Sequence, residues 1–445
     1  MAGSVSWKIR LAYALPALSL AVIGIPIYVY LPKFYTDTIG IDIGTVGMLV
    51  LCVRLFDAVS DPLAGYASDV VKTPWGRRRP WIVLGALGLA FSLYFLFVPP
   101  EGAGPYQAIR FGGLLFLVFL FWTVMTVPYE SLGPELTDDY HERTGLFGLR
   151  DGCLIIGTAL AAGSPAFADW LNQALGYTSS ERMTFFTLAL MYGPFLLITA
   201  WICVLMVREH YPHVSGHDDF FGGYRSVFQN KPFVILLVAY TISAFGSNLP
   251  ATLILYYVEY VLGYHDADRF LGLYFLVGIA FLPFWVFISK KIGKKAAWMA
   301  AMAINTGAFA FVFFLGPGDV RAYGILVALS GVGFGAGLAL PSSIQADVID
   351  YDELMTEKRR EGRYIGLWSI SKKMAAALGV GLGLWMLGRT GYQPNVEQKE
   401  GVVLMLRILY ALVPCLCNGV AMAVIWFYPI DETRFHDIKA GTARI

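Results

Sequence analysis

Residues 11–32 read LAYALPALSLAVIGIPIYVYLP and contain no Asp, Glu, Lys or Arg. A helix needs about 20 mainly apolar residues to cross the hydrocarbon core of a bilayer. This stretch is too long for the apolar part of a secretory signal, and no small-residue cleavage site follows it. It therefore predicts a first membrane-spanning helix that is retained.

Equally apolar stretches recur along the chain. Eight more lack Asp, Glu, Lys and Arg: 81–100, 111–129, 183–207, 232–258, 270–289, 296–318, 322–346 and 408–430. Three further stretches qualify when a few charges are allowed inside them: 43–68, 145–170 and 364–387. The sequence thus predicts an all-α membrane protein with twelve transmembrane helices.

The composition agrees with lipid as the main solvent. Hydrophobic residues make up 57% of the 445 residues and charged residues 15%, whereas soluble chains contain about 25% charged residues. The net charge of +1 provides no basic excess for a nucleic-acid partner. The five cysteines are odd in number and lie in apolar stretches, so no disulfide framework is expected.

A long polar interruption divides the chain into an N-terminal six-helix half (1–207), a central cytoplasmic loop (208–231) and a C-terminal six-helix half (232–445). Basic loops recur at equivalent places, WGRRRP at 75–80 and KKIGKK at 290–295. Two halves in parallel repeat are typical of a transporter with a central binding site. The alternative is that these loops serve only as topology determinants.

The loop charges predict the orientation, because Lys and Arg are enriched in cytoplasmic loops. With both termini in the cytoplasm, 21 of the 33 Lys and Arg residues fall on the cytoplasmic side, seven on the opposite side and five inside spans. We therefore expect a multi-pass protein of a bacterial inner membrane with both termini cytoplasmic.

Ionisable residues inside spans are costly and are functional candidates. The second predicted span contains Arg54, Asp57 and Asp61 at i, i+3 and i+7, which places them on one helical face with Ser60 beside them. Two carboxylates a turn apart could bind a hard monovalent cation or share a proton. The alternative is a structural Arg54–Asp57 pair, with Asp61 solvated near the cytoplasmic end.

Polar residues of other spans could converge on this face. The fourth span contributes Thr123, Thr126 and Glu130, although Glu130 could instead pair with a loop arginine at the cytoplasmic end. Arg150 in the fifth span has a planar guanidinium group that could bind two oxygens of a carboxylate or of sugar hydroxyls. The competing interpretation is a pair between Arg150 and an aspartate of the second span.

The eleventh predicted span contains the adjacent Lys372 and Lys373. Adjacent helical residues point about 100° apart, so at most one of the two can face the centre of the bundle. An inward lysine near the acids would repel an incoming cation or replace it when the site is empty, which is a coupling role.

No pattern indicates an enzyme, because G-x-S-x-G, Walker A and C-x-x-C motifs are all missing from the sequence. His210, His213 and His217 share one polar loop, where solvation is favoured over metal binding. We expect no cofactor, and an ion gradient would have to drive transport.

Several motifs resemble those of the glycoside-pentoside-hexuronide:cation symporters of the major facilitator superfamily, whose best-known member is melibiose permease. The most specific is RLFDAVSDP at 54–62. The others are YTD at 35–37, WGRRRPW at 75–81, VPY at 127–129, ER at 142–143, ADVIDY at 346–351 and GYQPN at 391–395. The resemblance covers nearly the whole chain and implies the major facilitator fold.

The resemblance also implies site roles. Asp57, Ser60, Asp61 and Thr123 match the family's cation site, in which Asp57 and Asp61 would hold a monovalent cation only. Lys373 matches its helix-eleven lysine and, with Arg54, is expected to act in coupling. Arg150 matches its sugar-binding arginine.

The chain departs from melibiose permease at the sugar site. The aspartate of helix one has no counterpart in 11–32, and an aspartate and a tryptophan of helix four are replaced by Thr126 and Glu130. These two positions, with Arg150, are the candidate substrate residues. Ser60 replaces an amide of the cation site, which leaves Na⁺ and H⁺ both open.

We expect a symporter, coupled to Na⁺ or H⁺, that imports a sugar, glycoside or uronide by alternating access. Its expected partners are a small-molecule substrate, a coupling cation and the lipid bilayer, and the protein is expected to be a monomer. The alternatives are a symporter of a lysophospholipid or other organic anion, as in related animal symporters, or a non-transporting receptor or assembly factor on the same fold.

Overall fold

The computed structural model describes residues 6–71, 73–102, 105–133, 136–137, 140–209, 227–356 and 361–430. Contacts divide the chain into two compact units. The first comprises Met1–Val214 with the short segments Leu384–Arg389 and Gln393–Val396, and the second comprises the remainder. The predicted boundaries at 207 and 232 stay a prediction, because most of the intervening loop lies outside the described residues.

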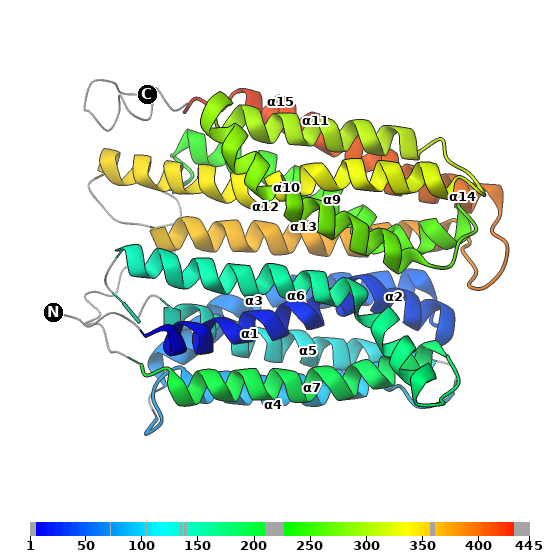
Figure 1. Ribbon diagram of the computed structural model, residues 1–445, viewed down its shortest axis with the longest axis horizontal. Coiled ribbons are helices and arrows are strands. Elements are labelled where there is room, and N and C mark those ends of the chain that lie inside the picture. Colours follow the sequence, from blue (N-terminus) through cyan, green and yellow to red (C-terminus); the bar gives the residue numbers. More distant parts are fainter. Residues whose placement is uncertain are drawn as a thin grey trace. The chain divides into compact units, whose positions relative to one another are not determined.

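Long helices make up each unit and run alongside one another within it (Figure 1). The helices of the first unit are α1 (Trp7–Ile25), η1 (Pro26–Tyr30), α2 (Leu31–Lys33), η2 (Phe34–Thr38), α3 (Ile43–Val70), α4 (Arg79–Phe97), α5 (Pro105–Leu132), α6 (Tyr140–Ala174) and α7 (Glu181–Met206). Within this unit α5 packs against both α3 and α4, and α1 packs against α6 and α7.

The remaining helices follow in the second part of the chain. They are α9 (Lys231–Tyr260), α10 (Ala267–Ile292), α11 (Lys294–Val312), α12 (Val320–Thr356), α13 (Glu361–Arg389), α14 (Glu400–Arg407), η4 (Ile408–Leu412) and α15 (Val413–Trp426). Helix α12 packs on α10 and α11, and α15 packs on α9 and α11.

Ten helices of the described chain are long and apolar enough to cross a membrane. They coincide with ten of the twelve predicted spans. The other two predicted spans, 43–68 and 296–318, are helical at α3 and α11 but are not among these ten. The all-α membrane fold is confirmed, whereas the number twelve stays a prediction.

Glycines allow the helices to approach closely. A Cβ atom added to Gly85 of α4 would lie 2.5 Å from the backbone nitrogen of Met125 in α5. In the second unit, a Cβ added to Gly335 of α12 would lie 2.5 Å from the carbonyl oxygen of Gly278 in α10. Small residues at such crossings are typical of packing between membrane helices.

In each unit, a basic side chain near the start of the third long helix donates hydrogen bonds to backbone carbonyl groups at the end of the last long helix. Arg79, the first residue of α4, donates from Nε to the carbonyl oxygen of Val207 at 2.9 Å. Lys295 of α11 donates from Nζ to the carbonyl oxygens of Trp426 and Tyr428 at 2.6 and 2.9 Å. These carbonyls lie at helix ends, where the helix itself provides no donor. The repeated basic loops therefore have a structural role in addition to any role in topology.

Glu209 adds a further contact in the first unit. Its carboxylate accepts hydrogen bonds from the backbone N–H groups of Arg77, Arg78 and Arg79 at 2.6–2.9 Å. These N–H groups lie at the beginning of α4, where the helix dipole favours a negative charge. Gly76 is required beside them, because its φ is +118° and an added Cβ would lie 2.6 Å from the Glu209 carboxylate.

Candidate cation and substrate site

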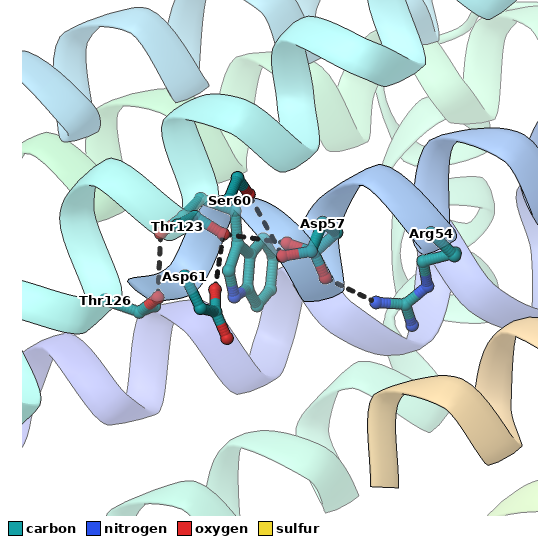
Figure 2. Close-up of polar contacts among 7 residues, drawn as sticks. Arg54, Asp57, Ser60, Asp61, Thr123 and Thr126 are labelled. Carbon is teal, nitrogen blue, oxygen red and sulfur yellow. Dashed lines mark hydrogen bonds and ion pairs between the residues drawn. The ribbon is translucent and has the colours of Figure 1, made fainter. Parts of the chain in front are cut away.

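Helix α3 carries the most concentrated set of buried charges in the predicted site. The Asp42 side chain begins the helix by accepting a hydrogen bond from the Thr45 N–H at 2.8 Å. Further along the helix, Asp57 and Asp61 lie on the side of α3 that faces Thr123 of α5, and Arg54 lies beside Asp57 (Figure 2). Arg54, Asp57 and Ser60 are buried, and Thr123 is fully buried. The predicted common face of α3 is thus confirmed, whereas the roles of these residues stay predictions.

Thr123 joins the two carboxylates. Its hydroxyl oxygen lies 2.7 Å from Oδ1 of Asp57 and 3.0 Å from Oδ1 of Asp61 (Figure 2). A threonine hydroxyl has one hydrogen and can donate it to only one of these oxygens at a time. The second contact is favourable when the other carboxyl group is protonated or when a cation lies between the oxygens. The arrangement therefore suits the uptake of one positive charge.

Asp61 is more than a solvated acid at the end of the helix. It is partly buried and hydrogen bonded to Thr123, so the alternative of a simply solvated Asp61 is wrong. All the oxygen ligands offered here are carboxylate or hydroxyl oxygens, which suit hard cations. Asp57, Asp61 and Thr123 thus provide a donor set that fits a monovalent cation.

Ser60 is placed differently from the other three predicted ligands. Its hydroxyl donates to the backbone carbonyl of Asp57 at 3.0 Å, within its own helix. The hydroxyl hydrogen is therefore used, and only the oxygen lone pairs remain to face a cation. The role of Ser60 as a ligand stays a prediction.

Arg54 is held by both charge and aromatic rings. Its Nη1 lies 3.4 Å from Oδ2 of Asp57. Its guanidinium carbon lies 4.1 Å from the ring centroid of Tyr28 in η1 and 4.4 Å from that of Phe119 in α5. Sequence reasoning missed both rings, because the first and fourth spans contain several aromatic residues and no charge pattern distinguishes these two.

Arg150 on α6 forms a separate and more exposed pair. Its Nη2 and Nε lie 2.8 and 2.9 Å from Oδ1 of Asp151. Its guanidinium also lies over the ring of Phe147 at 4.9 Å. The ion pair with Asp151 replaces the pair with an α3 aspartate that was the competing interpretation, which is therefore wrong.

The two other substrate candidates lie on α5. Thr126 donates to the carbonyl oxygen of Trp122 at 2.9 Å, so its hydrogen is used within the helix. Glu130 is exposed near the end of α5 and close enough to Arg150 for electrostatic attraction. Neither position is shown to touch a substrate, and both stay candidates.

The two lysines lie on α13, in the second unit. Lys372 is exposed and Lys373 is partly buried. The coupling role of Lys373 stays a prediction. Among the described residues there is no group of three or more His, Cys, Asp and Glu side chains that could hold a metal ion. His210, His213 and His217 lie outside those residues.

Comparison with known proteins gives a family. Residues 12–432 match the family model described as MFS/sugar transport protein. The chain is 26% identical to the glucuronide carrier protein homolog of Escherichia coli K12, over 97% of this chain and 94% of that protein. It is 28% identical to the putative sulfoquinovose importer of the same strain, over 91% of this chain and 87% of that protein.

Solved transporters share the fold. A bacterial homologue of the human lysosomal transporter Spinster has a TM-score of 0.64 at 15% identity, with coverage of 97% of this chain and 96% of that one. The nucleoside transporter NupG has a TM-score of 0.66 at 13% identity, with coverage of 94% and 100%. These structures show the fold, and the family match and the relatives show a multi-span transporter rather than an enzyme. The chain therefore belongs to the MFS/sugar transport family, in agreement with its resemblance to the hexuronide-type symporters.

Proposed function

We propose that this sugar-type transporter is a symporter that imports an acidic sugar, a glycoside or a uronide together with one monovalent cation, Na⁺ or H⁺. The observation that carries the proposal is the single Thr123 hydroxyl between the carboxylates of Asp57 and Asp61. Two acids in contact with one hydroxyl are arranged to accept one positive charge, and gradient-driven symport requires such a site.

The names of two relatives support an acidic substrate. One is named as a glucuronide carrier and the other as a putative sulfoquinovose importer, and both compounds are sugars with an acidic group. Arg150 is the residue of this chain best suited to such a group, because its planar fork pairs with two oxygens at once. An incoming acid would compete with Asp151 for this fork.

Coupling follows if the cation and the substrate favour the same state of the carrier. Binding of one then increases the affinity for the other by the same factor. The loaded carrier reorients by alternating access, and Arg54 and Lys373 act in coupling. The proposal includes a monomer in a bacterial inner membrane with both termini in the cytoplasm.

The test is uptake into proteoliposomes that contain the purified protein. The panel includes a glucuronide, sulfoquinovose, the neutral disaccharide melibiose and a lysophospholipid, each with an imposed Na⁺ gradient, an imposed H⁺ gradient or neither. We expect accumulation of an acidic sugar only under an inward gradient of one cation. Accumulation that is independent of both gradients would contradict coupling, and a protein that exchanges none of these compounds would contradict the proposed substrate class.

A further inference from the structure

Two neighbouring aromatic rings lie against the guanidinium group of Arg54. The rings belong to Tyr28 of η1 and Phe119 of α5, and their centroids lie 6.0 Å apart. The Arg54 guanidinium carbon lies within 4.4 Å of both centroids. This distance is well inside the limit of about 6 Å for attraction between a cation and an aromatic face.

The ion pair of Arg54 is longer than usual. Charge-assisted N–H···O bonds are usually about 2.7–2.9 Å long, whereas the Arg54–Asp57 distance is 3.4 Å. The Arg54 side chain is 7% exposed, and its Nε is buried with no hydrogen-bond partner. Arg54 is therefore held by the rings as well as by Asp57, and a closer approach to Asp57 would satisfy more of its donors.

The backbone at Tyr28 is also unusual. Residues Pro26–Tyr30 form a π-helical turn between α1 and α2. Pro26 has no backbone N–H and cannot continue the hydrogen-bond ladder of α1. Single π-helical turns within helices occur frequently at functional sites. This turn changes the register of the helix at the point where the Tyr28 ring covers Arg54.

We propose that Tyr28 and Phe119 are positioning residues that hold Arg54 away from Asp57, so that the Asp57 carboxylate stays available to the coupling cation. This inference rests on the proposed cation symport. Without the rings, Arg54 would move onto Asp57, form a short ion pair and compete with the cation. Loss of a ring therefore weakens cation binding through Arg54 rather than through a lost ligand.

The experiment measures the cation concentration that gives half-maximal uptake, together with substrate exchange at equal cation concentrations. We expect Phe119→Leu and Tyr28→Leu to raise the half-saturating cation concentration roughly 5- to 30-fold, with exchange little changed. Tyr28→Phe keeps the aromatic face and should behave like the wild type. Phe116→Leu is the matched control, because Phe116 lies on the same helix but packs on Phe56.

The decisive variant combines Phe119→Leu with Arg54→Gln. If the ring acts through Arg54, Phe119→Leu has no further effect on cation dependence in the Arg54→Gln background. A full effect in that background, or an equal effect of Phe116→Leu, would overturn the inference. So would unchanged cation dependence in both leucine variants. A wild-type protein without any cation dependence would instead overturn the proposed function, so the two failures are distinguishable.

Discussion

Two arginines of the first unit have similar chemical partners but very different surroundings. Arg54 and Arg150 each pair with an aspartate and lie over an aromatic ring. The Arg54 side chain is 7% exposed, lies against two aromatic rings and is 3.4 Å from its aspartate. The Arg150 side chain is 24% exposed, lies against one aromatic ring and is 2.8 Å from an aspartate that is itself 56% exposed.

The difference indicates two kinds of task. A buried charge whose acid is shared with other groups is expensive and is retained for a specific purpose. A partly exposed ion pair contributes little free energy, so a ligand can replace its acid at small cost. We therefore propose that the surroundings of Arg54 serve cation binding and that the Arg150–Asp151 pair serves exchangeable contact with the substrate.

Among substitutions that keep both carboxylates, the largest change is expected at Thr123, whose single hydroxyl contacts both of them. Thr123→Val keeps the shape of the side chain but removes the group that contacts both carboxylates. A hydrogen bond to a charged group contributes up to about 3 kcal/mol, so we expect the half-saturating cation concentration to rise roughly 100-fold. Gradient-driven uptake at varied cation concentration measures it.

Thr126→Val is the control for this change. Thr126 lies one turn further along α5, and its hydroxyl donates to the Trp122 carbonyl within the helix. Its removal should leave cation dependence almost unchanged. Equal effects of the two valine variants would show that Thr123 has no special relation to the cation.

A smaller change is expected at Arg150 and should affect the substrate alone. Arg150→Lys keeps the positive charge but loses the planar fork. The loss of one charge-assisted hydrogen bond, about 1.5 kcal/mol, predicts a roughly 10-fold higher KM for an acidic sugar. The half-saturating cation concentration should not move. Arg208→Lys, at an exposed position after α7, is the control. A shift in cation dependence in Arg150→Lys would contradict the proposal that Arg150 serves the substrate and Arg54 the cation.

The smallest change is expected at Asp151. Because an exposed ion pair contributes about 0–1 kcal/mol, Asp151→Asn should alter KM less than about fivefold. KM should fall, since the substitution removes an acid that competes with the substrate for Arg150. Initial uptake rates at varied substrate concentration measure this effect, and a large loss of uptake would mean that Asp151 has a role of its own.

The charged face of α3 could be predicted from the sequence, because charge is rare inside spans and the i, i+3, i+7 spacing of Arg54, Asp57 and Asp61 has one geometric meaning. Thr123 is one of three polar residues of the fourth span that could converge on this face, and the family resemblance singles it out, since hydroxyl residues are common in membrane helices. Arg150 stands out as a charge inside a span and also matches the family's sugar-binding arginine, but its partner Asp151 could not be predicted, because adjacent residues on a helix usually point apart.

The rings around Arg54 could not be predicted for a different reason. Tyr28 is one of several aromatic residues in the first span, and the π-helical turn Pro26–Tyr30 changes the periodicity from which its direction would be inferred. Similarly, the basic loop 75–80 was recognised as a repeat, but the binding of Glu209 to its N–H groups depends on the return of the chain after α7. Both features arise from tertiary contacts between distant segments.

The most direct test of cation coupling is made with Asp57→Asn, which removes one carboxylate and keeps the shape of the side chain. Proteoliposomes are loaded with substrate to measure exchange, and empty ones receive an inward cation gradient to measure accumulation. We predict that Asp57→Asn loses gradient-driven accumulation and retains exchange. Accumulation that equals that of the wild type would contradict it.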